Sequence, residues 1–298
     1  MIIVKLMGGL GNQMFQYAAA KRLAWRHGTS LNLDLSFLES KQTGGTPRRF
    51  QLEHLNIIAQ KASRMEIALM TGKGNSFLET AAVQILQKTG FTKHNPNICR
   101  ETHFHFDPEI LALPDNTYLE GYWQSEKYFK GIGAIIRSEF TVKSPLSEKN
   151  LALAEIIQAT NSVSVHVRRG DYVTDEKTNA SHGVCNPDYY LECESRIGHT
   201  VNNPHLFVFS DDSEWVIENI RFKHPVTYVS HNSCEAYQDL RLMSLCKHNI
   251  IANSSFSWWG AWLSAHTDKI ILVPEKWFND ASLDTRDLIP ESWIKVKV

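Results

Sequence analysis

The chain has 298 residues, of which 43% are hydrophobic and 21% are charged, with 31 lysines and arginines against 32 aspartates and glutamates. A chain of this length is expected to form about two domains and to bury about three quarters of its unfolded surface, so it needs no disulfide scaffold. The formal charge of -1 gives no broad basic surface for nucleic acid or for an anionic membrane. Any phosphate group must therefore be recognised by a local cluster of cations.

Cysteine usage and the N-terminus predict the compartment. The five cysteines are an odd set without a C-x-x-C pair, which is typical of reduced thiols in the cytosol. The first residues, MIIVKLMGGLGNQ, show neither a basic region followed by an apolar one nor a segment long enough to span a membrane. We expect a cytoplasmic protein with no integral membrane segment, for which a loose association with the inner face of the membrane stays open.

The first half of the chain has the pattern of an α/β domain. The expected elements are a strand at 2–7, a helix at 12–26, a strand at 31–35, a helix at 62–88 broken near 72–74, a strand at 117–122 and a helix at 128–140. Residues 40–95 carry the weakest pattern, and no function is assigned to them.

The second half repeats the alternation of strands and helices. A helix at 147–160 is followed by expected strands at 162–167, 205–209, 226–229, 249–252 and 269–273, with helical patterns between them. This alternation predicts parallel sheets covered by helices on both faces, in two domains at 1–150 and 151–298. Ligands of such sheets bind beyond the carboxyl ends of the strands.

A glycine-rich turn, GGLGNQ at 8–13, joins the first strand to the first helix. Glycines permit a tight turn and let a ligand approach the backbone. The dinucleotide pattern G-x-G-x-x-G needs a third glycine where the chain has Met14, and Asp34 alone is weak evidence for a ribose contact. The spacing leaves two interpretations open, a ligand site and a plain connection with Asn12 as the helix cap.

Two arginines follow the apolar strand at 162–167, in the segment HVRRGDY at 166–172. An arginine fork binds phosphate through two hydrogen bonds and could neutralise a diphosphate leaving group without a metal. The alternative is an ion pair of arginine with aspartate that fixes the loop. Strand alternation places Arg168 on the same face as His166, so we expect Arg168 to face the ligand.

The segment FSDD at 209–212 ends the next strand and begins a helix. Its simplest interpretation is an N-cap with acidic residues beside the helix dipole. The functional interpretation is a carboxylate that accepts hydrogen bonds from a guanine ring. The chain has no D-x-D triplet, no H-E-x-x-H and no cluster of cysteine and histidine, so we predict no metal requirement.

The segment NSSFSWWGAW at 253–262 again follows a strand and begins a helix. Hydroxyl groups and backbone N–H groups at a helix N-terminus can hold phosphate, although the serines could also be simple caps. The tryptophans at 258, 259 and 262 are expected to pack in the core, with at most one reaching a ligand.

Taken together these segments resemble the α-1,2-fucosyltransferase family, especially its soluble bacterial members. The segments that carry the resemblance are GGLGNQMFQYA at 8–18, LEGYWQSEKYF at 119–129, HVRRGDY at 166–172, FSDD at 209–212 and IIANSSFSWWGAWL at 250–263. They occur in order along nearly the whole chain, with no recognised match at about 40–95.

The resemblance implies a GT-B-type α/β fold of two Rossmann-like domains facing across a cleft, with 1–150 on the acceptor side and 151–298 binding GDP-fucose. It implies an inverting, metal-independent enzyme that transfers L-fucose from GDP-β-L-fucose to the 2-hydroxyl of a terminal β-galactoside, in a glycan such as a bacterial surface polysaccharide. The implied donor-binding residues are His166, Arg168, Arg169, Asp211, Asp212, Ser254, Ser255 and Phe256, and the implied acceptor-side residues are Asn12, Gln13, Tyr122, Trp123 and Gln124.

The expected mechanism is a single displacement in which Arg168 and helix-end donors stabilise charge on the departing GDP. Asp171 is the candidate general base, but an ion pair with Arg169 would lower its pKa and make it a poor one. Two other classes stay open: a galactoside-binding protein without catalysis, and a nicotinamide-dependent oxidoreductase. The linkage preference, the biological glycan and the oligomeric state are not encoded in these motifs.

Overall fold

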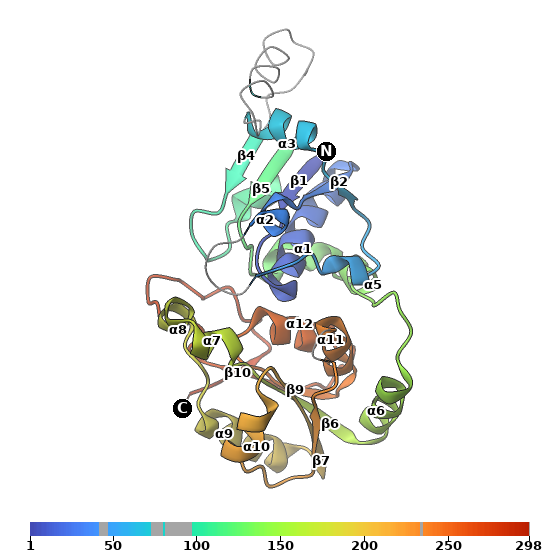
Figure 1. Cartoon of the computed structure of the whole chain (residues 1–298), viewed down its shortest axis with the longest axis vertical. Helices are drawn as coiled ribbons and strands as arrows, with labels where there is room; N and C mark the ends of the chain where they lie inside the picture. Colours follow the sequence, from blue (N-terminus) through green and yellow to red (C-terminus); the bar gives the residue numbers. More distant parts are fainter. Residues whose placement is uncertain (42–46, 73–79, 81–96, 233–234, 298) are drawn as a thin grey trace. The chain divides into compact units, whose positions relative to one another are not determined.

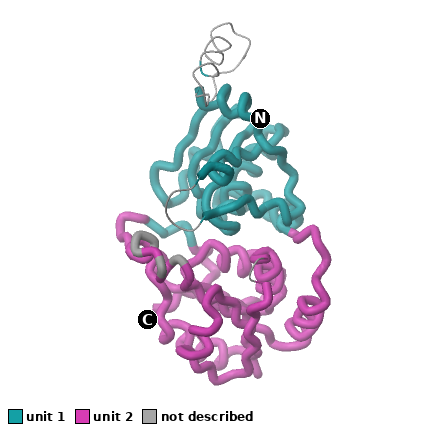
Figure 2. The backbone as a smooth tube through the Cα atoms, viewed as in Figure 1, with its two compact units in different colours: residues 1–140, 284–288 teal, residues 141–283, 289–298 magenta. Residues whose placement is uncertain are grey.

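The structure is a computed structural model that describes residues 1–41, 47–72, 80, 97–232 and 235–297 (Figure 1). Two compact units are distinguished in Figure 2: unit 1 comprises residues 1–140 and 284–288, and unit 2 comprises residues 141–283 and 289–298. Most of the helix expected at 62–88 lies outside the described residues. The boundary expected at residue 150 falls inside a helix of unit 2.

Unit 1 is built on a five-stranded parallel sheet of order β3-β2-β1-β5-β4. Its strands are β1 (Ile2–Lys5), β2 (Leu31–Asp34), β3 (Gln60–Lys61), β4 (Asn97–Arg100) and β5 (Thr117–Glu120). Its α-helices are α1 (Leu10–His27), α2 (Ser36–Glu39), α3 (Arg64–Thr71) and α5 (Gly133–Glu139), with short 3-10 helices at Leu52–His54, Pro108–Ala112, Glu126–Tyr128 and Lys130–Ile132.

Helix α1 begins two residues before its expected start. Gly8 has a φ of 75°, which glycine adopts without a steric penalty, and Gly9 is the N-cap. Asn12 lies inside the helix, so the interpretation in which Asn12 is the cap is wrong. The helix ends at Gly28, whose φ of 59° gives the left-handed conformation common at helix C-termini.

Both α1 and α3 pack against the sheet of unit 1. Ile3 and Tyr118 form a cluster with Met70 of α3, while α1 contacts β1 and β2. Helix α5 is joined to α1 through Tyr17, whose hydroxyl donates a hydrogen bond of 2.6 Å to the buried carboxylate of Glu139. These contacts hold the turn that precedes α1 at the carboxyl edge of the sheet.

Unit 2 is built on a six-stranded parallel sheet of order β11-β10-β9-β6-β7-β8. Its strands are β6 (Asn161–Val167), β7 (Pro204–Ser210), β8 (Val226–Val229), β9 (His248–Ile250), β10 (Ile271–Pro274) and β11 (Ile294–Val296). Its helices are α6 (Glu148–Ala159), α7 (Gly170–Thr174), α8 (Glu176–His182), α9 (Pro187–Thr200), α10 (Ser213–Asn219), α11 (Ala236–Leu245) and α12 (Ser255–Leu263).

Strand alternation divides the core of unit 2 between the two faces of the sheet. Val163 and Val165 of β6 pack with Tyr190 of α9 on one face. Phe207 and Phe209 of β7 pack with α6 and α11 on the other. A parallel sheet is buried on both faces in this way because its crossover helices cover both.

The expected α/β class with two Rossmann-like units is confirmed by these parallel sheets. The strands that the sequence pattern missed, β3, β4 and β11, each lie at an edge of a sheet. Edge strands are short and half exposed, so their apolar pattern is weak. Within the described parts of the chain, no helix combines the length and the hydrophobicity that crossing a bilayer requires.

Candidate functional site

Three sequence motifs meet at one edge of the unit 2 sheet. Strands β9, β6 and β7 are adjacent and parallel, with Val165 opposite Ile250 and Val208 opposite Val165. The motifs at 253–257, 166–172 and 209–212 follow or end these strands, so their residues converge at the carboxyl edge. This is the edge at which open α/β sheets bind ligands.

The two arginines are paired with the two aspartates of the neighbouring strand end. Arg168 Nη1 lies 2.7 Å from Asp211 Oδ2, and Arg169 Nε lies 3.1 Å from Asp212 Oδ2. The backbone N–H of Arg169 also donates to Asp211 Oδ1 at 2.9 Å. The register of β6 and β7 ends with Val167 opposite Ser210, and the two ion pairs follow in the same order one and two residues further along each segment.

In the structure Arg169 is paired with Asp212, and the Arg169–Asp171 ion pair considered from the sequence lies outside the described side chains. Asp171 is the second residue of α7, and its side chain is outside the described part of the structure. Asp212 also caps α10 by accepting a hydrogen bond from Trp215 N at 3.3 Å, as the N-cap interpretation of the sequence predicted. Its carboxylate therefore serves both the helix and the arginine.

An aromatic ring lies beside each guanidinium group. The Cζ atom of Arg169 is 3.5 Å from the centre of the Trp215 ring, and that of Arg168 is 5.4 Å from the centre of the Tyr172 ring. Arginine over an aromatic face is stabilised by the ring quadrupole. The side chain of Arg169 is 16% exposed and that of Arg168 is 23% exposed. Neither arginine is buried too deeply to meet a ligand.

His166 is a buried neutral histidine. Burial, reinforced by the charge of Arg168, lowers the pKa of His166 to about 3. Its ring lies 5.4 Å from the ring of Phe256 at the start of α12, and its Nδ1 has no hydrogen-bond partner among the described residues. A neutral imidazole with an unused nitrogen can donate to or accept from a polar ligand group.

The N-terminus of α12 supplies backbone donors at the same edge. Its first intrahelical bond runs from Trp258 N to Ser254 O at 3.0 Å, so the helix itself does not use the N–H groups of Ser255 to Ser257. Ser254 is the N-cap residue, and its side chain makes no capping hydrogen bond. This arrangement suits an anionic group.

The tryptophans of α12 are core residues, as expected from their spacing. Trp258 and Trp259 are fully buried, and Trp262 is 6% exposed. Trp258 also packs against Trp293, at 5.3 Å between ring centres. The buried tryptophans fix α12 in the core of unit 2, and its N-terminus lies at the carboxyl edge of the unit 2 sheet.

Asn253 and the rings of Tyr172 and Trp215 are the site residues that sequence reasoning missed. Asn253 is buried, and its Nδ2 donates to the carbonyl oxygens of His182 and Trp277 at 2.9 and 3.1 Å. Their positions in the sequence could have indicated two of them, because Asn253 is the first residue of the serine-rich motif and Tyr172 is the last residue of the arginine motif. Their partners lie in loops that only the fold brings near.

In unit 1, two of the acceptor-side candidates contact each other. Gln124 Nε2 donates to Asn12 Oδ1 at 3.0 Å. Gln13 is fully buried: its Nε2 donates to Gly8 O and Arg49 O, and its Oε1 accepts from Gln51 N. The amide of Gln13 thus holds the glycine turn and the segment around residue 50.

The Tyr122-Trp123 turn is held by Glu101, which the sequence did not indicate. Its carboxylate accepts from Tyr122 N at 2.7 Å and from Trp123 N at 2.9 Å, and burial raises its pKa. Trp123 is 1% exposed with a φ of 55°, whereas Tyr122 is 38% exposed. Of the acceptor-side candidates, Tyr122 has the side chain that solvent reaches best.

The glycine turn of unit 1 does not lead to a ribose-binding carboxylate. Asp34 is 1% exposed, and its carboxylate accepts from Tyr118 Oη at 2.6 Å and from Ser36 N at 2.8 Å. A ligand cannot reach it without breaking these bonds. Asp34 therefore cannot serve as the ribose-binding carboxylate that a nicotinamide-dependent oxidoreductase would need.

Comparison with known proteins decides the family. The model of the family described as glycosyl transferase family 11 matches residues 1–297, nearly the whole chain. The chain belongs to glycosyl transferase family 11.

Similar proteins align with this family 11 glycosyltransferase along nearly its full length. The α-1,2-colitosyltransferase of Escherichia coli is 35% identical over 307 residues, which cover 99% of each chain. The O-antigen biosynthesis glycosyltransferase WbnK of Escherichia coli is 34% identical over 310 residues, covering 98% of this chain and 99% of the relative. The galactoside 2-α-L-fucosyltransferase of Caenorhabditis elegans is 23% identical over 318 residues, covering 99% and 79%. The resemblance noted in the sequence is confirmed.

Among solved structures, the NodZ α-1,6-fucosyltransferase co-crystallized with GDP aligns with a TM-score of 0.48 at 15% identity. The alignment covers 87% of the family 11 chain and 91% of the NodZ chain.

Proposed function

We propose that this family 11 glycosyltransferase is an inverting α-1,2-fucosyltransferase that transfers L-fucose from GDP-β-L-fucose to the 2-hydroxyl of a terminal β-galactoside. The observation that carries the proposal is the arrangement at the edge of unit 2. Arg168 and Arg169 at the end of β6 and the N-terminus of α12 after β9 are on adjacent strands. Together they offer charged and backbone donors for a diphosphate.

In the proposed reaction the 2-hydroxyl oxygen of the acceptor attacks the anomeric carbon of fucose, and the bond from that carbon to the GDP oxygen breaks. The hydroxyl proton passes to a general base, and GDP leaves with the negative charge. Arg168 would exchange Asp211 for the diphosphate as that charge develops. Loss of such a contact lowers the rate by on the order of a hundredfold or more.

Asp171 is our proposed general base because it follows the arginines at the first turn of α7. We expect Asp171→Asn to lose turnover while still binding GDP, and Arg168→Ala to weaken both. Near-normal turnover of Asp171→Asn would remove Asp171 from this role.

The remaining candidates keep their proposed roles around the donor and the acceptor. His166 and Asp211 or Asp212 would lie near guanine, Ser254, Ser255 and Phe256 near the diphosphate, and Tyr122 with the Asn12–Gln124 pair near the acceptor sugar. We propose further that the reaction needs no metal and no cofactor. We also propose that the protein works in the cytoplasm, because Cys193 and Cys246 are buried free thiols.

Thermal unfolding followed by a transfer assay tests the proposal. We expect GDP and GDP-fucose to raise the Tm, GDP-mannose to raise it less and NADH to leave it unchanged, because only ligands that bind the native state stabilise it. Fucose transfer to lactose should persist in EDTA. Failure of both guanine nucleotides to bind would overturn the donor assignment, and binding of lactose alone would favour the galactoside-binding alternative.

A second donor is favoured by the relative named α-1,2-colitosyltransferase, which is 35% identical to this chain. Colitose is L-fucose without the 3-hydroxyl group, so both GDP-sugars present the same diphosphate and differ at one ring position. Competition between GDP-fucose and GDP-colitose at equal concentration separates the two. A site that hydrogen-bonds the 3-hydroxyl should prefer GDP-fucose strongly; preference for GDP-colitose would make the protein a colitosyltransferase.

A further inference from the structure

Arg168 stands at one end of a column of flat side chains in unit 2. Its guanidinium group lies over the ring of Tyr172. The Tyr172 ring is stacked on the ring of His182 at 4.8 Å between centres and 18° between planes. The His182 ring in turn lies 5.0 Å from the ring of Phe278. The column joins the end of β6, helices α7 and α8, and the loop after β10.

Asn253 holds the middle of this column through the backbone. Its Nδ2 donates to His182 O at 2.9 Å, to Gly183 O at 3.3 Å and to Trp277 O at 3.1 Å. Its own carbonyl oxygen accepts from Tyr172 Oη at 3.3 Å. One buried residue therefore fixes both the segment that carries His182 and the hydroxyl end of the Tyr172 ring.

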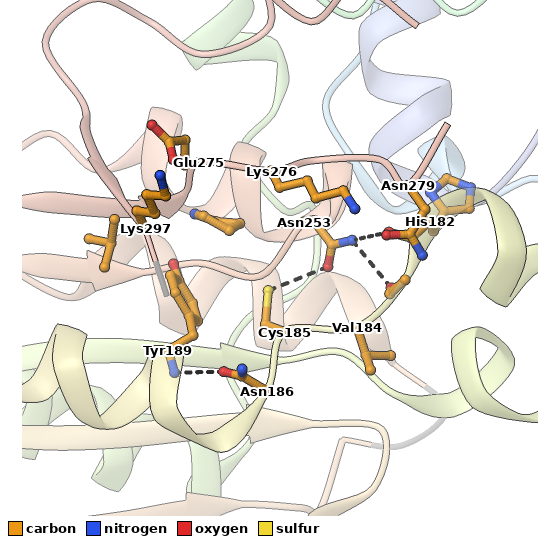
Figure 3. Close-up of a pocket in the computed structure, with 13 residues that line it drawn as sticks. His182, Val184, Cys185, Asn186, Tyr189, Asn253, Glu275, Lys276, Asn279 and Lys297 are labelled. Atoms are coloured by element: carbon orange, nitrogen blue, oxygen red, sulfur yellow. Dashed lines mark hydrogen bonds between the residues drawn. The ribbon is translucent and has the colours of Figure 1, made fainter. Parts of the chain in front are cut away.

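Hydrogen bonds are needed there because packing is incomplete on one side. His182, Gly183 and Asn253 line a pocket of about 330 Å³, whose wall is drawn in Figure 3. A segment that borders empty space can shift into it unless directional bonds hold its backbone. The bonds from Asn253 hold the backbone of this segment at His182 and Gly183.

Both Asp211 and the Tyr172 ring contact the guanidinium group of Arg168. The ion pair with Asp211 fixes one edge of the guanidinium group, and the Tyr172 ring covers a face of it. A ligand diphosphate that replaced Asp211 would leave the contact of the guanidinium group with the Tyr172 ring in place, and this contact constrains the orientation of the guanidinium plane. Orientation matters because arginine binds phosphate through two parallel hydrogen bonds.

We propose that Tyr172, held by Asn253 and His182, is a positioning residue for Arg168. The proposal rests on the proposed function, since it assumes that Arg168 contacts the diphosphate. Asn253, in the serine-rich motif, would then help to orient Arg168, in the arginine motif, through Tyr172.

The test is a double-mutant cycle on the affinity for GDP, with guanosine as the ligand that lacks phosphate. Tyr172→Leu should weaken GDP binding by about 3- to 30-fold, the range of a partly buried contact between a cation and a ring, and should leave guanosine binding unchanged. Tyr172→Phe keeps the ring but loses the hydrogen bond to Asn253 O, so it should weaken GDP binding less than Tyr172→Leu does. In the Arg168→Ala background, Tyr172→Leu should cause no further loss.

Each contrary result has a separate meaning. Unchanged GDP affinity in Tyr172→Leu, or an equal loss in both backgrounds, overturns the positioning role. A wild-type protein that does not bind GDP overturns the proposed function instead. If Tyr172→Leu fails to fold, His182→Leu removes the next ring of the column and should give a smaller loss of the same kind.

A ligand-free measurement keeps the inference testable in every case. With Asp211→Ala present in all three proteins, so that the ion pair no longer holds Arg168, the Nε–H signal of Arg168 in NMR relaxation should show a lower order parameter with Tyr172→Leu than with Tyr172 or Tyr172→Phe. Equal order parameters in all three proteins would contradict the proposal whether or not GDP binds.

Discussion

Two neighbouring arginines of this chain have different surroundings. Arg169 is held by Asp212 and lies 3.5 Å from the centre of the Trp215 ring, while Arg168 is paired with Asp211 and is the more exposed of the two. The more confined side chain can support the loop, and the more exposed one can change partners. The strand and helix beside them thus give two residues of the same type different surroundings.

His166 shows how burial at this site affects stability. The pKa of His166 is lowered to about 3, chiefly by burial, so the native state keeps it neutral where the unfolded chain takes up a proton. Between the unfolded pKa of about 6.5 and about 3, the unfolded state binds more protons. This contribution to stability is complete above that window and is lost as the pH falls through it.

We predict that His166→Phe makes the stability less sensitive to acid. The wild type should lose up to about 1.4 kcal/mol of unfolding free energy per pH unit more than the variant between pH 6 and pH 4. Urea unfolding at several pH values measures the difference, and His199→Phe at an exposed site of α9 is the control. Parallel pH profiles for the wild type and His166→Phe would contradict the prediction.

At the level of elements, helix α1 has a left-handed glycine near each end. A Cβ atom at Gly8 would lie 2.5 Å from Asn12 Nδ2, whereas a Cβ atom at Gly28 would meet no atom within 4 Å. Asn12 cannot move freely, because its Oδ1 accepts the hydrogen bond from Gln124. Gly8 is required because of its positive φ and because Asn12 leaves no room for a Cβ atom, whereas Gly28 is required only because of its positive φ.

We predict that Gly8→Ala destabilises the protein more than Gly28→Ala. Gly28→Ala should cost about 1 kcal/mol from the positive φ, and Gly8→Ala about 2–3 kcal/mol because Asn12 must also be displaced. The midpoints of urea unfolding give both values. The prediction fails if the two substitutions have the same effect, which would mean that Asn12 moves aside at no cost.

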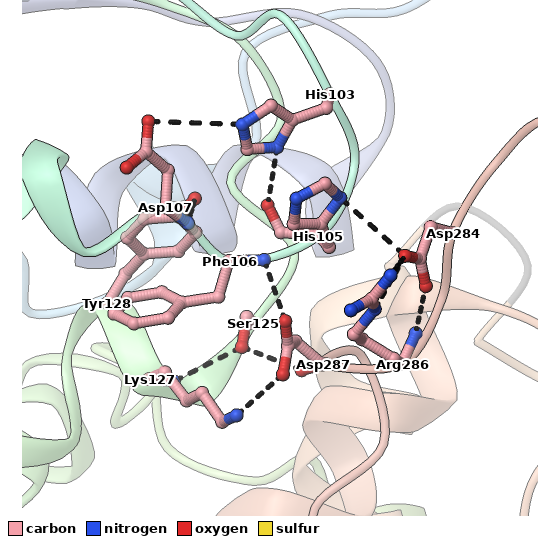
Figure 4. A network of polar contacts seen from close by, with 10 residues as sticks. All are labelled: His103, His105, Phe106, Asp107, Ser125, Lys127, Tyr128, Asp284, Arg286 and Asp287. Atoms are coloured by element: carbon pink, nitrogen blue, oxygen red, sulfur yellow. Dashed lines mark hydrogen bonds and ion pairs between the residues drawn. The ribbon is translucent and has the colours of Figure 1, made fainter.

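At the level of the whole molecule, a segment near the C-terminus completes unit 1. Residues 284–288 belong to that unit, although both their chain neighbours belong to unit 2. Asp287 is the main contact: its carboxylate accepts from Phe106 N at 3.1 Å and pairs with Lys127 Nζ at 2.5 Å, and its carbonyl accepts from Ser125 Oγ at 2.6 Å (Figure 4). Its side chain is 13% exposed, so water screens these contacts only in part.

We predict that Asp287→Ala loosens this segment. The backbone amide of Phe106 loses its acceptor, and hydrogen exchange at that amide should speed up by roughly tenfold, the effect of about 1.4 kcal/mol. Exchange in β6 and β7 of unit 2 should not change. Arg286→Ala, which removes a 69% exposed side chain paired with Asp284, is the control and should leave the Phe106 amide protected.

Local pattern determined much of this fold. The central strands β1, β2, β5, β6, β7, β9 and β10 and the edge strand β8 were predicted within a few residues, because strands of a covered parallel sheet are rich in apolar residues. The glycine turn, the family resemblance and the motif segments at strand ends were also readable from the sequence. The edge strands β3, β4 and β11 were not, because exposure weakens their pattern.

Only the tertiary structure decided the partners of the site residues. The pairing of Arg168 with Asp211 depends on the register of two strands about 40 residues apart, which no local pattern specifies. The hydrogen bonds from Asn253 to residues 182, 183 and 277 join loops that are distant in the sequence. The same is true of the hydrogen bond between Asp287 and Phe106 in unit 1. The sequence determined which chemical groups stand at the ends of the strands; strand order and register determined which of them meet, because contacts between distant segments arise only when the sheet assembles.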